Sequence, residues 1–229
     1  MKTLNSWQVG LGGSLIHPFF MTDAVSFKTR VANEAIRYAS IYKEVMIDNE
    51  YLVFSHGFTE RSYYILKAYK TNYLHLIGVH TELSPAVFFD RCLDGTLTES
   101  DFDFCFAGKK ESEVKGSVRR KIKSLSCIPS FFSNISAVEE KFSKGHISCA
   151  LADTDGQVTI GYAKADNCVP MTLLHGNELT MKAVKCDLLL SRKKGTDIFD
   201  SILIGEDELI DQFSKDNPEI LVIFSSISR

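Results

Sequence analysis

The chain has 229 residues, a formal net charge of −3 and a hydrophobic fraction of 45%. This length and composition are sufficient for a substantial core, which excludes a disordered chain. No uninterrupted apolar run approaches the roughly 20 residues that span a bilayer, so we expect no contact with the membrane.

Six cysteines lie 13 to 22 residues apart, without a C-x-x-C pair or a cluster with histidine. This spacing disfavours a zinc site. The Walker loop, H-E-x-x-H and Asp-rich patterns are also absent from the sequence, so we expect no cofactor and a metal-independent mechanism if the protein is an enzyme. The first residues do not read as a secretory signal. We therefore expect a cytoplasmic protein with reduced thiols.

The N-terminal region begins with a glycine-containing stretch over residues 1–22, which predicts an irregular lead-in. Apolar residues then recur at helical spacing from Asp23 to Val45. The pattern predicts a long amphipathic helix with Thr22 or Asp23 as its N-cap. We expect this helix to cover one face of a sheet.

The following segment alternates short β-rich and helical patterns. Residues 51–55 and 63–69 flank a polar loop and predict a hairpin. Ser84-Pro85 is typical of an N-cap followed by proline in the first turn, so a short helix is expected up to Gly95. Residues 109–125 predict a second, basic helix.

The C-terminal region is richer in strand patterns. Residues 147–152 and 158–164 flank Asp155-Gly156, a strong hairpin signal. Residues 185–193 and 198–204 predict a second hairpin, with a helix at 207–213 and a further strand at 220–227. The sequence therefore predicts an α+β fold in which N-terminal helices pack on a C-terminal, mainly antiparallel sheet of about four strands.

No repeat or linker divides the chain, so we expect a single domain over residues 1–229. Within it, residues 23–145 should be mostly helical with a small hairpin. Residues 146–229 should form the antiparallel sheet.

Two histidines, His75 and His80, lie five residues apart beside Thr81. Histidine exchanges protons near neutral pH, which makes both candidates for acid–base catalysis. His75 also stands in an apolar run, so a hydrogen-bonded core histidine is the alternative interpretation.

A basic run is offset by only two glutamates, and it creates a local positive patch on an acidic chain. Such a patch can bind phosphates. A solvated helix face is the ordinary alternative. The candidate phosphate-binding residues are Lys109, Lys110, Arg119 and Arg120, with Arg192 from a later strand.

Hydroxyl and cationic residues lie near the ends of predicted strands, among them Thr172 and Lys193. Cleavage of a phosphodiester needs a base, an acid and positive charge near the phosphate. A convergence of Thr172 and Lys193 with His75 would meet this need. Such residues are also common at ordinary strand ends, so both interpretations stay open.

Several short segments, taken in order, resemble the phage-associated branch of the barnase, EndoU, colicin and RelE-like nuclease superfamily. They cover roughly residues 50–205 and comprise residues 73–78 (YLHLIG), 88–93, 97–104 (LTESDFDF), 161–162 and 170–174. The resemblance implies N-terminal helices against a four-stranded antiparallel sheet. It also implies cleavage of RNA without metal, often by toxins or in conflict between phage and host.

The reaction implied by this resemblance is attack of a ribose 2′-hydroxyl on the adjacent phosphate, which leaves a 2′,3′-cyclic phosphate. His75 would be the acid or base, Thr172 an orienting hydroxyl, and Lys193 or Arg192 a cation for the transition state. The acidic balance of the chain departs from basic ribonucleases of this kind. A non-enzymatic module that binds RNA or a protein partner on the same scaffold, such as an inhibitor, is therefore the alternative function.

Overall fold

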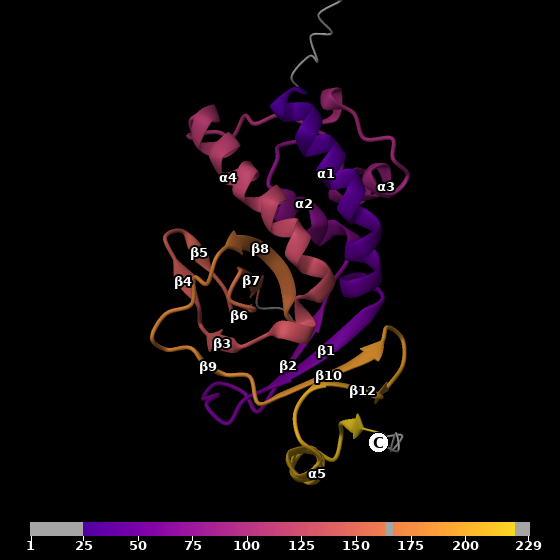
Figure 1. Cartoon of the computed structure of the whole chain (residues 1–229), viewed down its shortest axis with the longest axis vertical. Helices are drawn as coiled ribbons and strands as arrows, with labels where there is room; N and C mark the ends of the chain where they lie inside the picture. The colour runs from indigo at the N-terminus through magenta and orange to yellow at the C-terminus, as the bar shows by residue number, and fades with distance from the viewer. Residues whose placement is uncertain (1–24, 164–166, 223–229) are drawn as a thin grey trace, which may run out of the picture.

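The computed structural model describes residues 25–163 and 167–222 (Figure 1). Its α-helices are α1 (Phe27–Tyr42), α2 (Tyr73–Ile77), α3 (Pro85–Leu93), α4 (Glu111–Ser124) and α5 (Asp207–Asp216). A π-helical turn, Lys43–Ile47, extends α1, and short 3-10 turns occupy Lys70–Asn72, Glu99–Asp101, Leu125–Ser130 and Phe132–Asn134. Helices α1 to α4 gather at one end of the molecule, the strands follow, and α5 lies at the other end (Figure 1).

The strands form two main antiparallel sheets. One has the order β12 (Ser201–Ile204), β10 (Leu188–Lys193), β1 (Asn49–Phe54) and β2 (Tyr64–Lys67). The other has the order β8 (Val169–His175), β7 (Val158–Ala163), β6 (Leu151–Thr154), β3 (Ala137–Glu140) and β9 (Val184–Lys185). Two small pairs are β4 (Ser143–Lys144) with β5 (Ile147–Ser148), antiparallel, and β11 (Ile198–Phe199) with β13 (Leu221–Val222), parallel.

The predicted α+β class is confirmed, and so are the local signals of several elements. The side chain of Ser84 accepts a hydrogen bond from the Val87 amide at the start of α3. Ser26 caps α1 through the Thr29 amide. The caps predicted from the sequence, Thr22 and Asp23, lie outside the described residues. The Asp155-Gly156 turn joins β6 and β7 as predicted.

The strands of the predicted C-terminal sheet are divided between the two sheets. Strands β6 and β7 pair with β3 and β8, whereas β10 and β12 join the N-terminal β1–β2 hairpin. The residues of β10 explain this partition, because Leu188 and Leu190 pack with α5 while Leu189 belongs to the main core. A strand buried on both faces needs a central position, and β1 and β10 occupy the two central positions of their sheet.

Strand β8 was not predicted, because its Pro170 reads as the start of a connection. Proline is tolerated at the edge of a sheet, and β8 is the edge strand beside β7. Its hairpin with β7 brings Thr172 opposite Gly161. This strand also contacts α2 and α4, and thereby joins the sheet to the helical end.

The close approach at Gly161 gives a prediction about stability. A Cβ atom there would lie 2.5 Å from the Cys149 sulfur and 2.8 Å from a methyl carbon of Thr172. Gly161→Ala should therefore lower the free energy of unfolding by about 1–3 kcal/mol, because the core must shift. Gly116→Ala is the matched control, since its nearest atom is 3.9 Å away on the exposed Arg120.

Alanine at position 116 should raise stability by about 0.5–1 kcal/mol, because it improves the propensity of α4. Urea unfolding of both variants checks the pair. Equal stability of the two variants would contradict the packing seen between β7 and β8.

Candidate active site

A cavity of about 550 Å³ lies where α2, α4 and the loop before α4 meet β8. It contains two imidazoles, two ammonium groups and one carboxylate, from Glu113, together with hydroxyl side chains. The polar residues that line it include His75, His80, Thr81, Lys109, Ser117 and Lys121. Of the five best-formed cavities of the described residues, this one alone combines two histidines with two lysines.

The shape of α2 turns His75 toward the outside. Tyr73, Leu76 and Ile77 are buried, which leaves His75 exposed on a helix of five residues. Gly78 ends the helix with a φ of 79°, and its amide donates to the Leu74 carbonyl at 2.8 Å. The left-handed conformation favours glycine at this position.

Gly78 also makes room for Lys121. A Cβ atom at position 78 would lie 2.9 Å from the Cδ of Lys121. The lysine side chain passes this glycine, and its Nζ donates a hydrogen bond to the backbone carbonyl of His75. A single contact thus fixes both the end of α2 and the position of the ammonium group in the cavity.

The environment lowers the pKa of both groups. Partial desolvation in the cavity, assisted by the charge of Lys121, lowers the pKa of His75 below its usual 6.5. Burial, with a smaller contribution from the charge of Lys109, lowers the pKa of Lys121 from 10.5 to about 8. At neutral pH His75 is therefore mostly neutral and able to accept a proton, while Lys121 is mostly charged.

His80 forms a side-chain pair with Asp103. The two residues exchange backbone hydrogen bonds of 3.0 and 2.8 Å, and His80 Nδ1 lies 3.1 Å from Asp103 Oδ1. The amide of Cys105 donates to the same carboxylate, and this bond is the main cause of the lowered pKa of Asp103. Because an ionised carboxylate only accepts, Nδ1 carries the proton and Nε2 is left to exchange protons.

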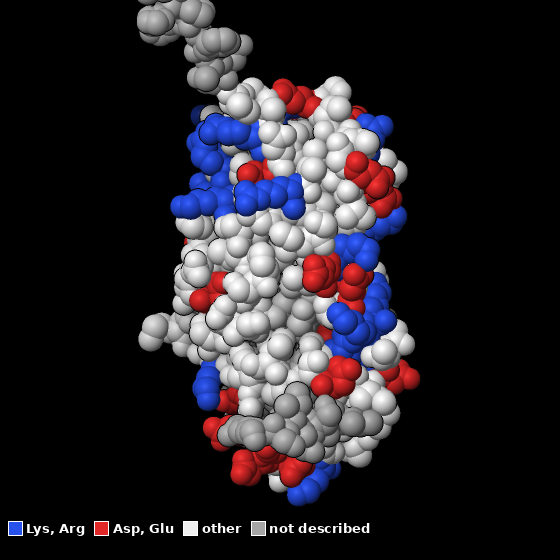
Figure 2. Space-filling view, turned by 45° about the vertical axis from the view of Figure 1, so that its right-hand side comes forward, with Lys and Arg blue, Asp and Glu red and all other residues white. Residues whose placement is uncertain are grey.

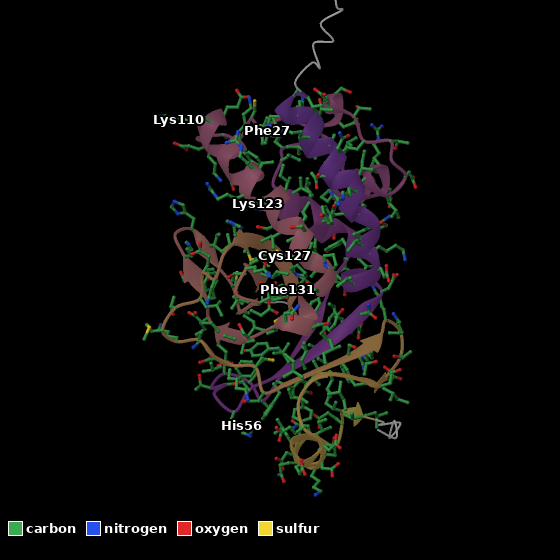
Figure 3. All side chains as sticks on the ribbon, in the orientation of Figure 1. Phe27, His56, Lys110, Lys123, Cys127 and Phe131 are labelled. Atoms are coloured by element: carbon green, nitrogen blue, oxygen red, sulfur yellow. The ribbon has the colours of Figure 1, made fainter. Side chains whose placement is uncertain are left out.

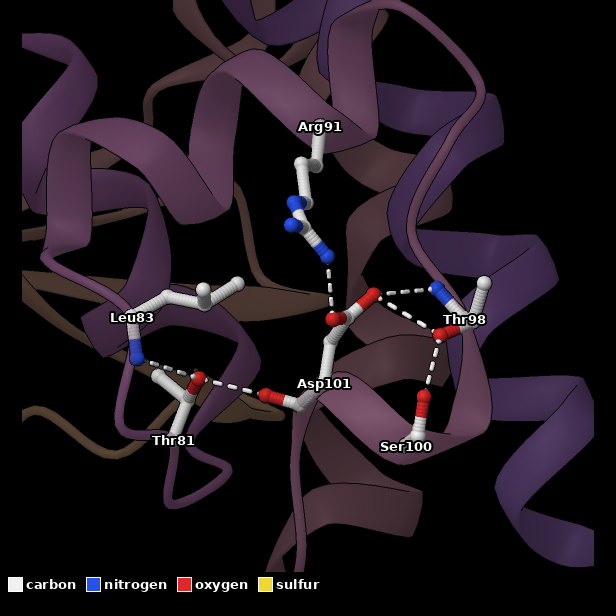
Figure 4. A network of polar contacts seen from close by, with 6 residues as sticks. All are labelled: Thr81, Leu83, Arg91, Thr98, Ser100 and Asp101. Atoms are coloured by element: carbon white, nitrogen blue, oxygen red, sulfur yellow. Dashed lines mark hydrogen bonds and ion pairs between the residues drawn. The ribbon is translucent and has the colours of Figure 1, made fainter.

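The segment between His80 and Asp103 is held by a network around Asp101 (Figure 4). The Asp101 carboxylate accepts from the amide and hydroxyl of Thr98, at 2.7 and 2.9 Å, and from Arg91 of α3. Thr81 donates to the backbone carbonyl of Asp101 and accepts from the Leu83 amide. These contacts tie both sides of the His80–Asp103 bridge to one helix.

The structure brings together some of the residues predicted from the sequence and separates others. His75 and Lys109 line the same cavity. Thr172 does not line it; this side chain is 5% exposed and packs beside Gly161. Lys193 is exposed at the end of β10, in the other sheet. The convergence of Thr172 and Lys193 with His75 is therefore not seen in this cavity.

The predicted phosphate-binding residues are spread over several surfaces. Arg192 donates hydrogen bonds from Nε and Nη2 to one carboxylate oxygen of Glu50, at 2.9 and 2.7 Å, and its guanidinium lies over the Phe199 ring. Its guanidinium therefore joins strands β1 and β10. Lys110 and Arg120 are exposed at the start and on the surface of α4, and Arg119 lines a second groove on that helix.

Sequence reasoning missed the particular roles of Lys121 and Asp103. Glu113, Ser117 and Lys121 share one face of α4 at a spacing of four residues, but the pattern alone does not say which face meets α2. Asp103 follows His80 by 23 residues, and only the folded loop brings them together. No local sequence signal predicts that pairing.

The described part of the chain contains no group of three His, Cys, Asp or Glu side chains arranged to hold a metal ion. Nor does any helix of the described residues have the length and apolar character to cross a membrane.

A model of a known protein family matches most of the chain. Residues 36–226 match the family model PBECR4, described as phage-Barnase-EndoU-ColicinE5/D-RelE like nuclease4. No curated protein and no solved structure matches the chain. The match begins within α1 and extends through both sheets, and it confirms the resemblance seen in the sequence. The chain therefore belongs to the PBECR4 family of phage-type nucleases.

Proposed function

We propose that the protein is an endoribonuclease that cleaves RNA without a metal ion at the cavity between α2 and α4. The observation that carries this proposal is the presence of His75, His80, Lys109 and Lys121 around one cavity. Two imidazoles and two ammonium groups supply the proton transfers and the positive charge that cleavage of an RNA phosphodiester needs. Membership of a nuclease family supports a nucleic-acid substrate.

In the proposed reaction, neutral His75 takes the proton of a ribose 2′-hydroxyl. The 2′-oxygen forms a bond to the adjacent phosphorus, and the bond from phosphorus to the 5′-oxygen breaks. His80, in its protonated form with Asp103 as counter-charge, gives its proton to that 5′-oxygen. The products are a 2′,3′-cyclic phosphate and a 5′-hydroxyl.

Lys109 and Lys121 are proposed to stabilise the negative charge that develops on the phosphate oxygens. Positive groups held in a partly desolvated cavity act more strongly than in water, which favours the transition state. The proposal keeps His75 and Lys109 from the sequence prediction. It assigns the cationic role to Lys121 in place of Lys193.

We further propose that this cleavage acts in conflict between phage and host, as a toxin, because the family is of phage type. Expression of the wild-type protein in growing bacteria should then stop growth and fragment RNA. A His75→Ala variant made at the same level should permit growth. Equal growth arrest by both proteins would show that toxicity does not depend on the proposed site.

The direct test is incubation of the purified protein with several labelled RNAs in the presence of a chelator. Cleavage that persists supports the proposed reaction, and the His75→Ala protein should not cleave. If the protein binds these RNAs tightly and leaves all of them intact, the alternative of a non-enzymatic binding module replaces the proposal. Cleavage that requires an added metal ion would also overturn the metal-independent mechanism.

A further inference from the structure

A second groove, of about 640 Å³, runs between α1 and α4. It uses other residues of α4 than the candidate active site does. Arg119, Ile122 and Lys123 line the groove, whereas Glu113, Ser117 and Lys121 line the cavity. Positions two residues apart on a helix point about 200° apart, so the two hollows lie on different sides of α4.

The groove is strongly basic although the chain carries a net charge of −3. Four exposed cationic side chains line it, namely Arg30, Arg37, Arg119 and Lys123. Among the described lining residues, Glu34 is the acidic one, 3.8 Å from Arg37. Figure 2 shows lysine and arginine side chains gathered over this helical end of the molecule.

Aromatic rings hold the arginines in the groove. The guanidinium groups of Arg119 and Arg30 lie 5.0 and 5.7 Å from the centre of the Phe27 ring. Arg37 lies 5.2 Å from the centre of the Tyr38 ring. Phe27 stands where α1 faces α4 (Figure 3). Guanidinium planes fixed in this way offer both stacking surfaces and forked hydrogen-bond donors.

Single-stranded RNA uses both features at once. Its unstacked bases stack on aromatic rings and guanidinium planes, and its phosphates accept from arginine and lysine. An acidic protein segment would use the charges and leave the stacking planes without a role. We therefore propose that the α1–α4 groove binds the single-stranded RNA that flanks the scissile phosphate, a proposal that rests on the proposed function of the neighbouring cavity.

This arrangement makes α4 a divider between the two sites. Lys121 in the cavity and Lys123 in the groove point to opposite sides of α4, so the width of the helix with its side chains, about 10–12 Å, lies between the two sites. A strand of several nucleotides that crosses over α4 can occupy both sites. The protein should prefer single-stranded RNA long enough to reach the groove over dinucleotides and over duplex RNA.

The test compares two triple variants of the full chain. Arg30→Gln/Arg119→Gln/Lys123→Gln neutralises the groove. Lys182→Gln/Lys185→Gln/Lys215→Gln is the control, because it removes the same charge from exposed positions outside it. For the groove variant, the ratio of kcat/KM on a 12-nucleotide RNA to kcat/KM on a dinucleotide should fall about tenfold or more. The control should keep the wild-type ratio.

Binding is measured separately from cleavage, by fluorescence anisotropy of a 12-nucleotide RNA whose 2′-oxygens are all methylated. The groove variant should bind about tenfold or more weakly, and its salt slope should be smaller by about 2, because three phosphate contacts are lost. Since this probe cannot react, the result shows whether the groove binds RNA even if the wild-type protein cleaves no RNA. In that event only the proposed catalytic function fails.

Equal binding of this RNA by the wild type, the groove variant and the control would overturn the proposal. A decaglutamate peptide tests the competing occupant. The peptide could bind the wild type but not the groove variant, while both proteins bind the RNA equally. In that case the groove binds an acidic protein segment, and the proposal is also overturned.

Discussion

Replacing His75 with alanine should lower kcat for RNA cleavage by about 10²- to 10⁴-fold, the usual contribution of a positioned acid or base. The variant should fold normally, because the His75 side chain is exposed on α2 and only its backbone carbonyl is bonded to Lys121. KM should change little, since the imidazole acts on the proton rather than on the bound phosphates. Single-turnover kinetics with saturating protein measures the loss.

His175→Ala is the matched control for this experiment. His175 is also exposed, but it lies near Ser124, with Nδ1 3.4 Å from the hydroxyl, and does not line the cavity. We expect wild-type kcat for this variant. Comparable losses in both variants would indicate a general effect on folding, and an unchanged His75→Ala protein would remove the proposed base.

The pH profile supplies an independent check on His75. Partial desolvation lowers the pKa of His75 below 6.5. The midpoint of the acidic limb in the pH profile of wild-type kcat/KM should therefore lie below pH 6.5. This limb reports the protonation of the base in the free enzyme. It should disappear from the residual activity of His75→Ala.

Replacing Lys121 with methionine should lower kcat on the order of 10²-fold and at the same time stabilise the fold. Methionine has a similar length and can pass Gly78 without a charge to desolvate. The loss of kcat follows from the missing positive charge beside the phosphate. The gain in stability follows from the lowered pKa of the lysine, which means that the folded protein holds its proton less tightly than the unfolded chain does.

The sign and the pH range of this effect follow from the two pKa values. Between about 8 in the folded state and 10.5 in the unfolded state, the unfolded chain binds more protons, so the free energy of unfolding of the wild type rises with pH. Below pH 8 the full cost of burying the charge is present. Lys121→Met should therefore be more stable than the wild type by about 1–3 kcal/mol at pH 7, and the gain should shrink toward pH 10.5.

Urea unfolding at pH 7 and pH 10 measures this difference. Lys123→Met is the control on the same helix, since its exposed side chain points into the groove and not into the cavity. Its stability difference from the wild type should not depend on pH in this way. A destabilised Lys121→Met protein at pH 7 would show that the hydrogen bond to the His75 carbonyl outweighs the cost of desolvation.

Local elements could be predicted from the sequence because short-range chemistry determines them. Ser84-Pro85 and Asp155-Gly156 act within a few residues, and α3 and the β6–β7 hairpin form where these signals predict them. The division of strands between two sheets depends on long-range pairing. Strand β10 pairs with β1, and residues Leu188 and Leu190 must bury their side chains against α5.

The site could be predicted only in part for the same reason. His75 and Lys109 carry chemistry that is visible in the sequence, and both line the cavity. Other contacts of the site come from distant positions: Lys121 of α4 packs against Gly78 and donates to the His75 carbonyl, and Asp103 pairs with His80 across a loop. The sequence also predicted a catalytic role for Lys193, but this residue lies at the end of β10 in the other sheet.

The most direct measurement uses a 12-nucleotide strand that is DNA at every position but one, with chelator present. The 2′-hydroxyl of that one ribose is the only nucleophile that the proposed reaction can use. The account predicts a single cut on the 3′ side of the ribose, with a 2′,3′-cyclic phosphate and a 5′-hydroxyl as the new ends, and no cut with His75→Ala. Cutting at deoxynucleotides, or new ends that carry a 5′-phosphate, would contradict it.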